Sequence, residues 1–128
     1  MKILVTGGAG FIGSNLVDGL VQRGHKVIVI DNFSTGQLTN LKENFRKIKV
    51  FKTDISLNKN LSKLKKIFRG VNCVFHLAGL ADIVPSIEKP NRYYETNVTG
   101  TLNILEAAKI NKVKKVIYAA SASCYGKS

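Results

Sequence analysis

The chain has 128 residues, 45% of them hydrophobic and 22% charged, and 20 Lys and Arg against 8 Asp and Glu give a net charge of +12. This composition predicts one folded domain with a substantial core and excludes a disordered chain. No apolar run approaches the length of a membrane span, and the start MKILVTGG lacks the apolar stretch of a signal peptide. We therefore expect no membrane partner and a cytoplasmic location.

The cysteines and histidines predict no metal site. Cys73 and Cys124 form no CxxC pair, and His25 and His76 stand far apart in the sequence. Because cysteines without ligand spacing stay reduced in the cytoplasm, we expect two free thiols and no bound metal.

The first half of the chain predicts three strands separated by helical segments. The apolar run 2–6 ends at glycines, and Ile12, Leu16 and Leu20 then recur at the spacing of a helix that Gly24 ends. A second buried strand is expected over 26–31, and a short helical or irregular segment around 41–45. Alternating Lys and apolar residues over 47–50 indicate a strand with one wet face.

The second half predicts two more strands and two more helices. Leu61, Leu64 and Phe68 are expected to face inward from a helix whose lysines form a solvated face; these are Lys59, Lys63 and Lys66. A buried strand lies within 72–79, a long helix spans 91–111, and a fifth strand begins at 114. Gly100 inside the long helix predicts close packing there, and Tyr94 and Tyr118 are interpreted as packing residues.

Strands that alternate with helices predict parallel pairing through right-handed crossovers. The expected fold is therefore α/β, a Rossmann-type doubly wound sheet of about five parallel strands in the order 3-2-1-4-5. Residues 1–128 show no linker or repeat, so we expect a single domain.

The glycines between the first strand and the first helix predict a dinucleotide site. Residues 8–13 fit GxGxxG, and residues 6–13 fit TGxxGxxG. Glycines there let the backbone approach a pyrophosphate at a helix N-terminus. Asp31 ends the second strand, where a carboxylate accepts the hydroxyls of an adenosine ribose and repels a 2′-phosphate, which favours NAD over NADP. The alternative for Asp31 is a capping or turn aspartate. Asp54 follows the third strand and is a candidate for the adenine.

Six motifs together resemble the extended short-chain dehydrogenase/reductase family and, within it, the nucleotide-sugar epimerases and dehydratases. They are VTGGAGFIGSNLV, DNFSTG, TDI, HLAG, YYETNVTGTLNILEAA and VIYAASASCYG. They span essentially the whole chain in the order and spacing of that family. The resemblance implies bound NAD, a nucleotide-sugar substrate (a UDP-sugar) and transient hydride transfer at a sugar hydroxyl.

The resemblance also implies roles for individual residues. Those implied to bind the cofactor are Gly7, Gly10, Phe11, Ile12, Gly13, Asp31, Asn32, Asp54, Ile55, Leu77, Ala78, Gly79 and Asn97. Ser121 is implied to hydrogen-bond the sugar hydroxyl that is oxidised. Two alternatives stay open: Asn97 as a helix asparagine bonded to the backbone, and Ser121 as a hydroxyl that caps a turn.

The catalytic Tyr-x-x-x-Lys pair of that family has no counterpart in these 128 residues. Tyr93, Tyr94 and Tyr118 are each followed four residues later by a residue other than lysine, and Tyr125 lies too near the end. An unperturbed tyrosine is a poor base at neutral pH, and the lysine of the pair lowers the pKa of the tyrosine. Without this pair, the chain is expected to be the NAD-binding N-terminal part of an epimerase-type enzyme and to be inactive alone.

Two other functions remain as alternatives. One is a non-catalytic dinucleotide-binding or interaction module, because a fold and a cofactor site do not establish activity. The other is a basic nucleic-acid-binding protein, which is less favoured because aromatic residues do not alternate with the basic ones. An exposed apolar surface on the open side of the sheet is expected to favour a homodimer.

Overall fold

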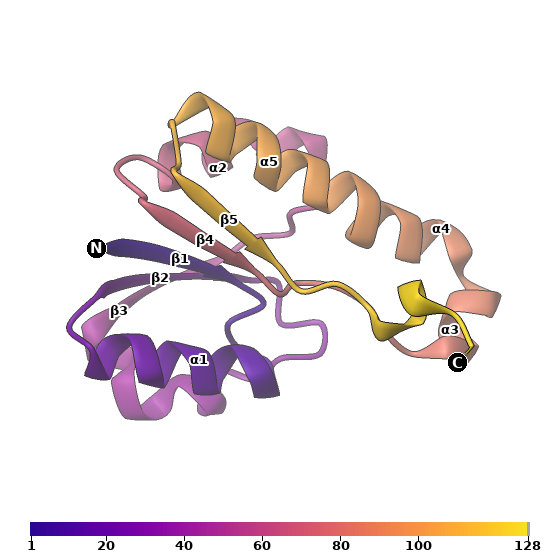
Figure 1. The fold of residues 1–128 in the computed structure, drawn as a ribbon, viewed down its shortest axis with the longest axis horizontal. Coiled ribbons are helices and arrows are strands. Elements are labelled where there is room, and N and C mark those ends of the chain that lie inside the picture. The colour runs from indigo at the N-terminus through magenta and orange to yellow at the C-terminus, as the bar shows by residue number, and fades with distance from the viewer. Residues whose placement is uncertain (128) are drawn as a thin grey trace.

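The computed structural model describes residues 1–127, which form one parallel sheet of five strands in the order β3-β2-β1-β4-β5 (Figure 1). Both the fold class and the strand order are as predicted. The strands are β1 (Lys2–Thr6), β2 (Lys26–Asp31), β3 (Ile48–Lys52), β4 (Cys73–His76) and β5 (Lys115–Tyr118).

Helices cover both faces of this sheet (Figure 1). They are α1 (Phe11–Gln22), α2 (Leu61–Ile67), α3 (Ile83–Glu88), α4 (Pro90–Tyr94) and α5 (Gly100–Ile110). The segment expected around 41–45 is a 3-10 helix, Leu38–Lys47. The helix expected over 91–111 is divided, because a π-helical turn at Glu95–Thr99 joins α4 to α5. No helix of residues 1–127 is long and apolar enough to cross a membrane.

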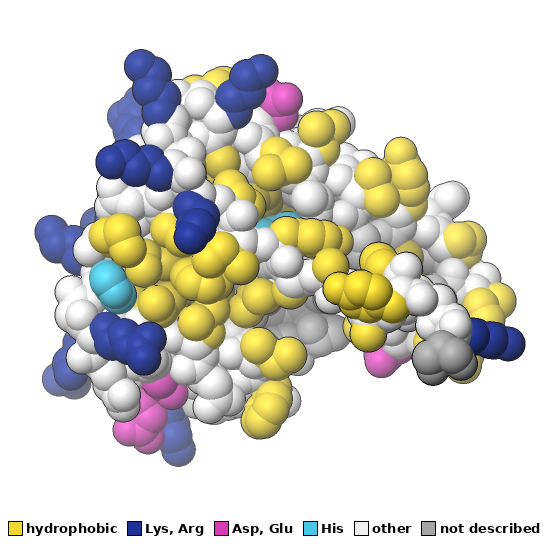
Figure 2. Space-filling view, viewed as in Figure 1, with side chains coloured by type: hydrophobic (Ala, Val, Ile, Leu, Met, Phe, Trp, Pro, Cys, Tyr) yellow, Lys and Arg dark blue, Asp and Glu magenta, His cyan; other side chains and the backbone are white. Residues whose placement is uncertain are grey.

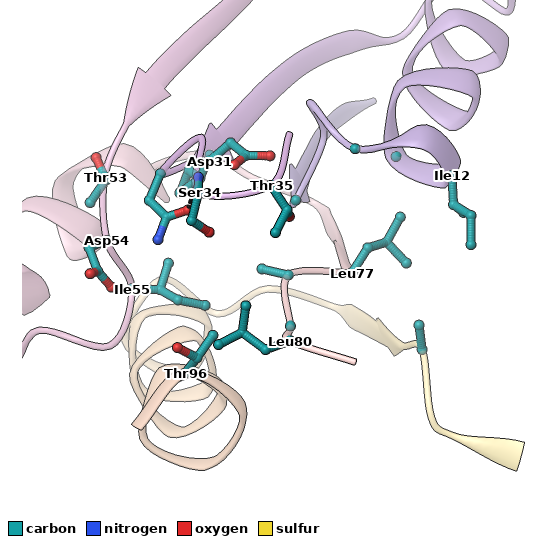
Figure 3. A pocket seen from close by; sticks show the side chains of 18 of the residues that line it. Ile12, Asp31, Ser34, Thr35, Thr53, Asp54, Ile55, Leu77, Leu80 and Thr96 are labelled. Carbon is teal, nitrogen blue, oxygen red and sulfur yellow. Dashed lines mark hydrogen bonds between the residues drawn. The ribbon is translucent and has the colours of Figure 1, made fainter. Parts of the chain in front are cut away.

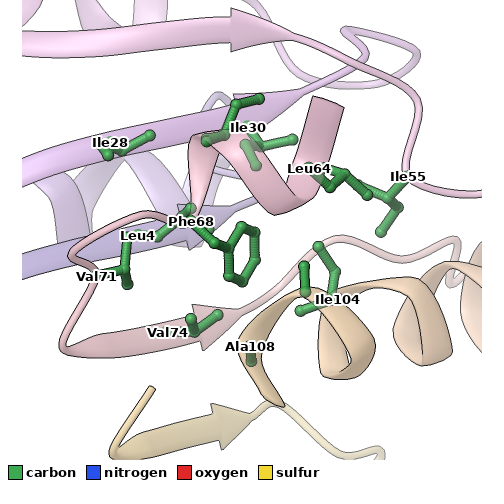
Figure 4. Close-up of a cluster of buried hydrophobic side chains, with 12 residues drawn as sticks. Leu4, Ile28, Ile30, Ile55, Leu64, Phe68, Val71, Val74, Ile104 and Ala108 are labelled. Carbon is green, nitrogen blue, oxygen red and sulfur yellow. The ribbon is translucent and has the colours of Figure 1, made fainter. Parts of the chain in front are cut away.

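Alternation along the strands builds two separate cores. In β1, Leu4 belongs to the cluster under α2 and α5, whereas Ile3 and Val5 belong to the cluster under α1. Phe68 of the first cluster is fully buried between the sheet and α5 (Figure 4). Since successive side chains of a strand point to opposite faces, one buried strand serves both layers.

Helix α5 packs through a face of small residues, as the glycine within it predicted. A Cβ at Gly100 would lie 2.9 Å from Cγ1 of Ile55. The packed face continues through Ile104, Ala107 and Ala108. Small side chains let the helix approach the sheet and α2 closely, so the predicted close packing at Gly100 is confirmed.

The apolar residues whose spacing predicted a helix over 91–111 are largely exposed. Tyr94 is 62%, Val98 50% and Leu102 56% exposed, so the interpretation of Tyr94 as a packing residue was wrong. Helix α5 instead packs on the sheet through the face that carries its small residues, because small side chains allow the helix to come close to the sheet. The helix thus presents a second apolar face on the outside.

The lysine-rich segments lie as expected. Lys59, Lys63 and Lys66 are exposed, and Leu64 and Phe68 are buried beneath them. The predicted alternation over 47–50 is confirmed, because Lys47 and Lys49 are exposed and Ile48 and Val50 are half-buried. In β3 the face of Lys49 is only partly exposed to water, since Phe51 packs against the first cluster.

Candidate functional site

A pocket of about 380 Å³ opens at the carboxyl ends of the strands, beside the turn between β1 and α1 (Figure 3). In doubly wound sheets this edge is where ligands bind, because the connections diverge there. Nineteen residues line the pocket: Gly7, Gly10, Phe11, Ile12, Gly13, Ile30, Asp31, Asn32, Ser34, Thr35, Thr53, Asp54, Ile55, Leu77, Ala78, Gly79, Leu80, Thr96 and Ala119.

The glycine turn forms one wall because side chains would not fit there. Gly7 has φ +71, and a Cβ on it would lie 2.8 Å from the nitrogen of Ala78. A Cβ on Gly13 would lie 2.8 Å from Cα of Gly8, so α1 starts directly against the turn. At Gly10 the nearest atom to an added Cβ is the Gly7 oxygen, at 3.4 Å. Gly7 and Gly13 therefore shape the turn, whereas Gly10 leaves space in the pocket.

The N-terminus of α1 is free to bind an anion. Gly10 is its N-cap, no side chain of residues 1–127 caps it, and its first turn has no acidic residue. The first intrahelical bond runs from the Ser14 N–H to the Gly10 oxygen, at 2.9 Å. The N–H groups of the first turn therefore face the pocket without an internal acceptor, in the arrangement that binds phosphate groups.

Asp31 lies at the end of β2 and is 9% exposed. Its Oδ2 accepts the Ala9 N–H at 3.0 Å, and its Oδ1 accepts the Phe33 N–H at 2.8 Å. The carboxylate thus holds the turn after β2, as the alternative interpretation had it, and also lines the pocket. Because a carboxylate oxygen can accept two hydrogen bonds, one acceptor position on each oxygen remains for a ligand hydroxyl.

Asn32 and Asp54 also line the pocket. The Asn32 Oδ1 accepts the Ser34 N–H at 3.0 Å. The Asp54 Oδ1 accepts both the N–H and the hydroxyl of Ser56, at 2.9 and 2.6 Å. These bonds fix the loops after β2 and β3, and the second carboxylate oxygen of Asp54 takes no part in them.

The segment after β4 forms the wall next to the glycine turn. Leu77, Ala78 and Gly79 line the pocket as implied, whereas Asn97 lies behind them. Asn97 accepts the Leu80 N–H with its Oδ1 and donates to the Leu80 oxygen with its Nδ2, both at 2.9 Å. In this structure Asn97 is therefore bonded to the backbone, as in its alternative interpretation, and it shapes the wall from outside.

Ser121 lies outside the pocket lining, although Ala119, two residues earlier, is part of it. Its hydroxyl accepts the Ser123 N–H at 3.1 Å and caps the 3-10 turn Ala122–Tyr125. The structure thus shows the capping geometry of the alternative, and the role of Ser121 toward a substrate stays a prediction.

Several lining residues were missed by the sequence reasoning. Ser34, Thr35, Thr53 and Ala119 all follow the carboxyl end of a strand, a position that could have marked them. Leu80, four residues after β4, shares that position. Thr96 had no such signal, because it comes to the pocket from a π-helical turn distant in sequence.

Burial sets the protonation of His76 and Cys73. His76 is 1% exposed, and burial lowers its pKa to about 4, so the ring is neutral at neutral pH. Burial raises the pKa of the Cys73 thiol, and nearby Lys115 opposes that shift. Both cysteines are free, as expected. In the part of the chain that the structure describes, no three His, Cys, Asp or Glu side chains gather as metal ligands.

A Rossmann-type sheet, a glycine turn at a helix N-terminus and a buried carboxylate at the end of β2 define a dinucleotide-binding domain. The turn meets the requirements of such a ligand, since Gly7 and Gly13 exclude a Cβ and Gly10 leaves room. The chain belongs to the NAD dependent epimerase/dehydratase family, whose model matches residues 3–128. NAD is the cofactor of this family, and several structural neighbours were crystallised with it.

Individual relatives agree with this assignment. The chain is 39% identical to a UDP-glucose 4-epimerase of Yersinia enterocolitica, and 42% identical to a UDP-N-acetyl-alpha-D-glucosaminuronate decarboxylase of Bacillus cytotoxicus. Each match covers 98% of this chain and 38% of the relative. A UDP-glucose-4-epimerase of Stenotrophomonas maltophila with bound NAD and formylated UDP-arabinopyranose superposes with a TM-score of 0.92 at 27% identity. That match covers 100% of this chain and 39% of the other. The chain thus spans about 38% of the length of these curated relatives.

Proposed function

We propose that residues 1–128 form the NAD-binding part of a nucleotide-sugar epimerase similar to UDP-glucose 4-epimerase. The observation that carries this proposal is the agreement between pocket and motif. Of the thirteen residues proposed to bind the cofactor, all except Asn97 line the pocket. The family membership and the bound NAD of a structural neighbour support the same assignment.

Different residues of the pocket are proposed to bind different parts of the cofactor. The first-turn N–H groups of α1 bind the pyrophosphate, and the glycines keep that approach open. Asp31 and Asn32 accept the adenosine ribose hydroxyls, and Asp54 with Ile55 flanks the adenine. NAD, when bound, supplies a hydride acceptor. Ser121 is proposed to meet the sugar hydroxyl, after leaving the turn that it caps here.

We further propose that this 128-residue chain has no epimerase activity. No tyrosine within it is followed by lysine four residues later. Hydride removal from a sugar hydroxyl requires that its proton leave to a base, and a tyrosinate beside a cationic lysine is such a base. The proposed substrate of the complete enzyme is a UDP-sugar, which several solved relatives contain.

The proposed setting is the cytoplasm, and the proposed assembly is a homodimer. Two free cysteines are typical of a reducing compartment. The exposed apolar side chains of α3 and α5, together with those of β5, supply a surface for self-association. Figure 2 shows hydrophobic side chains gathered over β5, and Lys and Arg side chains near the end of the sheet where β1 begins.

Calorimetric titration with NAD and NADP tests the cofactor assignment. We expect the wild-type chain to bind NAD, and NADP more weakly. Asp31→Asn should weaken NAD binding and narrow that preference, because it removes the charge that repels a 2′-phosphate. Asp82→Asn, at an exposed position outside the pocket lining, is the matched control. A folded chain that binds neither dinucleotide contradicts the assignment.

The inactivity is tested separately. The purified chain is incubated with NAD and UDP-glucose, and UDP-galactose is measured by chromatography. No interconversion is expected, and its appearance at a rate proportional to the concentration of the chain contradicts this proposal.

A further inference from the structure

His76 connects three parts of the fold that meet behind the pocket. It is the last residue of β4 and is 1% exposed. Its Nδ1 lies 2.6 Å from the hydroxyl of Thr6, the last residue of β1. Its Nε2 lies 2.8 Å from the hydroxyl of Thr101 on α5. The ring therefore bridges two strands and a helix through both nitrogens.

The partners of the two threonines determine which ring nitrogen carries the proton. The Thr101 hydroxyl donates to the Asn97 oxygen at 2.7 Å, so it accepts from the ring, and Nε2 is the donor. The Thr6 oxygen already accepts the N–H groups of Leu77 and Ala78, both at 3.1 Å, so its own proton points to Nδ1. Only the neutral tautomer with hydrogen on Nε2 satisfies both sides.

This network ends on the pocket wall at two places. On one side, Thr6 holds the N–H groups of Leu77 and Ala78, next to the glycine turn. On the other side, Thr101 bonds the Asn97 carbonyl, and the Asn97 amide holds both backbone groups of Leu80. The wall from Leu77 to Leu80 is thus fixed at both ends by groups that His76 joins.

The second side of the network passes through the π-helical turn. Asn97 lies within Glu95–Thr99, and Thr101 follows in α5. Such turns occur frequently at functional sites because they redirect side chains that a regular helix would place elsewhere. Here the turn directs the Asn97 amide toward Leu80, 17 residues earlier.

We propose that His76 is a positioning residue for the cofactor site: it holds the Leu77–Leu80 wall in its binding conformation through Thr6 and Thr101. This inference rests on the proposed NAD binding at that wall. His76 lies outside the pocket lining, so its effect passes through the backbone of the wall.

Variants that retain one half of the network separate its two sides. In His76→Asn a carbonyl takes the place of Nδ1, so the contact with Thr6 is kept and that with Thr101 is lost. In His76→Gln an amide reaches the place of Nε2, so the contact with Thr101 is kept. His76→Leu loses both contacts. Thr101→Val removes the hydroxyl from α5, so it loses the contact with His76 that His76→Asn also loses and, in addition, the hydrogen bond to the Asn97 oxygen.

Amide hydrogen exchange of the full chain by NMR measures the wall directly. We expect faster exchange of Leu77 and Ala78 in His76→Gln and His76→Leu, but not in His76→Asn. Thr101→Val and His76→Asn should instead accelerate Leu80. Amides in β2 should retain their protection. Uniformly faster exchange across β2 and the wall, or no change at the wall, overturns the proposal.

NAD affinity then links the wall to binding. We expect His76→Leu to weaken binding about tenfold and each single-sided variant about threefold. Thr101→Val should weaken binding less in the His76→Asn background than in the wild type, because the contact between His76 and Thr101 is then already absent. Val74→Ala, at a fully buried position in the same strand, is the matched control. Equal loss of affinity in this control at equal loss of stability means a purely structural role and overturns the proposal.

Failure of the two proposals gives different results. A wild-type chain that binds no NAD contradicts the proposed function, and the exchange rates at Leu77, Ala78 and Leu80 still decide whether His76 holds the wall. A wild-type chain that binds NAD, with unchanged affinity in His76→Leu, contradicts only the inference.

Discussion

The two faces of α5 are both apolar, but only one of them is packed. Ile104 and Ala107 are fully buried against the sheet and α2, whereas Leu102 is 56% and Leu105 46% exposed. Helix α1 differs after its first turn, where Phe11 and Ile12 are exposed at the pocket. Beyond that turn Val17 and Leu20 are buried, and the side away from the sheet includes Asn15 and Gln22. An amphipathic helix covers one surface, and a helix apolar on two sides has a second surface to cover.

The same contrast extends to the strands. β2 is buried from Val27 to Asp31, whereas in β5 only Val116 is even half-buried. The pocket lies mainly at the ends of β1, β2 and β4, and Ala119 is the lining residue that follows β5. We therefore expect the proposed cofactor site to depend mainly on the packed region, and we propose self-association as the role of the apolar surface of α5 and β5.

The largest expected effect compares two residues of α5. Ile104→Ala should lower the free energy of unfolding by about 3 kcal/mol, because it leaves a cavity between helix and sheet. Leu102→Ala should lower it by less than about 0.5 kcal/mol, since its side chain is already in water. Urea denaturation of both variants provides the measurement.

The result for Leu102 also sharpens the comparison. If the loss of unfolding free energy in Leu102→Ala grows with protein concentration, the exposed face is buried by self-association. If Leu102→Ala in dilute solution loses as much unfolding free energy as Ile104→Ala, the distinction between the packed and the exposed face of α5 is wrong.

The second expected effect separates folding from binding at the glycine turn. Gly13→Ala should destabilise the fold by about 2 kcal/mol, because its Cβ meets backbone atoms of Gly7 and Gly8. Gly10→Ala meets only the Gly7 oxygen at 3.4 Å. It should therefore keep stability within about 1 kcal/mol while NAD affinity falls about tenfold, since the methyl group occupies space for the pyrophosphate.

Thermal unfolding and NAD titration of both glycine variants provide the measurement. If Gly10→Ala binds NAD as the wild type does, the pyrophosphate lies elsewhere in the pocket.

The third effect concerns pH and His76, at the boundary between the two regions. Its pKa of about 4 in the fold lies below the ordinary value of 6.5. The unfolded chain therefore binds the proton more readily, so this contribution to stability is complete above about pH 6.5 and is lost as the pH falls toward 4. Between pH 7.5 and pH 5 it should decline by about 2 kcal/mol.

Urea denaturation at the two pH values, compared with His76→Asn, isolates this contribution. Between the two pH values, the unfolding free energy of His76→Asn should fall less than that of the wild type, because the variant lacks the titrating ring. An identical pH dependence in both proteins means that His76 is not the group responsible.

The smallest expected effect concerns the turns that lead into β2 and β5. Two residues after the end of α1 lies Gly24 at φ +82, and two residues after the end of α5 lies Lys112 at φ +54. Because a side chain is strained in this left-handed region, Lys112→Gly should stabilise the fold by about 0.5 kcal/mol. Gly24→Ala, with no atom near its Cβ, should destabilise it by about 1 kcal/mol.

Thermal denaturation resolves both changes in this chain. Destabilisation by Lys112→Gly would show that the lysine side chain makes a stabilising contact at the open side of the sheet.

Local signals were sufficient for the five strands, for most helices and for much of the pocket, but they did not predict α3 or the division of the helix expected over 91–111. Apolar runs that end at glycine gave the strands, and their alternation with helices gave the order β3-β2-β1-β4-β5. The same order places every strand end at one edge, so residues at or just after strand ends, such as Asp31, Asp54 and Ala78, meet there. These relations were predictable because each depends on a few neighbouring residues and on the geometry of parallel sheets.

What the sequence by itself determined was the class of fold and the shape of the glycine turn. Only the tertiary structure decided which face of α5 packs, because the spacing of Val98, Leu102 and Leu105 is as helical as that of Gly100, Ile104 and Ala107. Only the tertiary structure turned Asn97 to the Leu80 backbone and joined His76 to Thr6, 70 residues away, and to Thr101. Hydrogen bonds between distant segments depend on how close the packed layers come, and local sequence does not encode that distance.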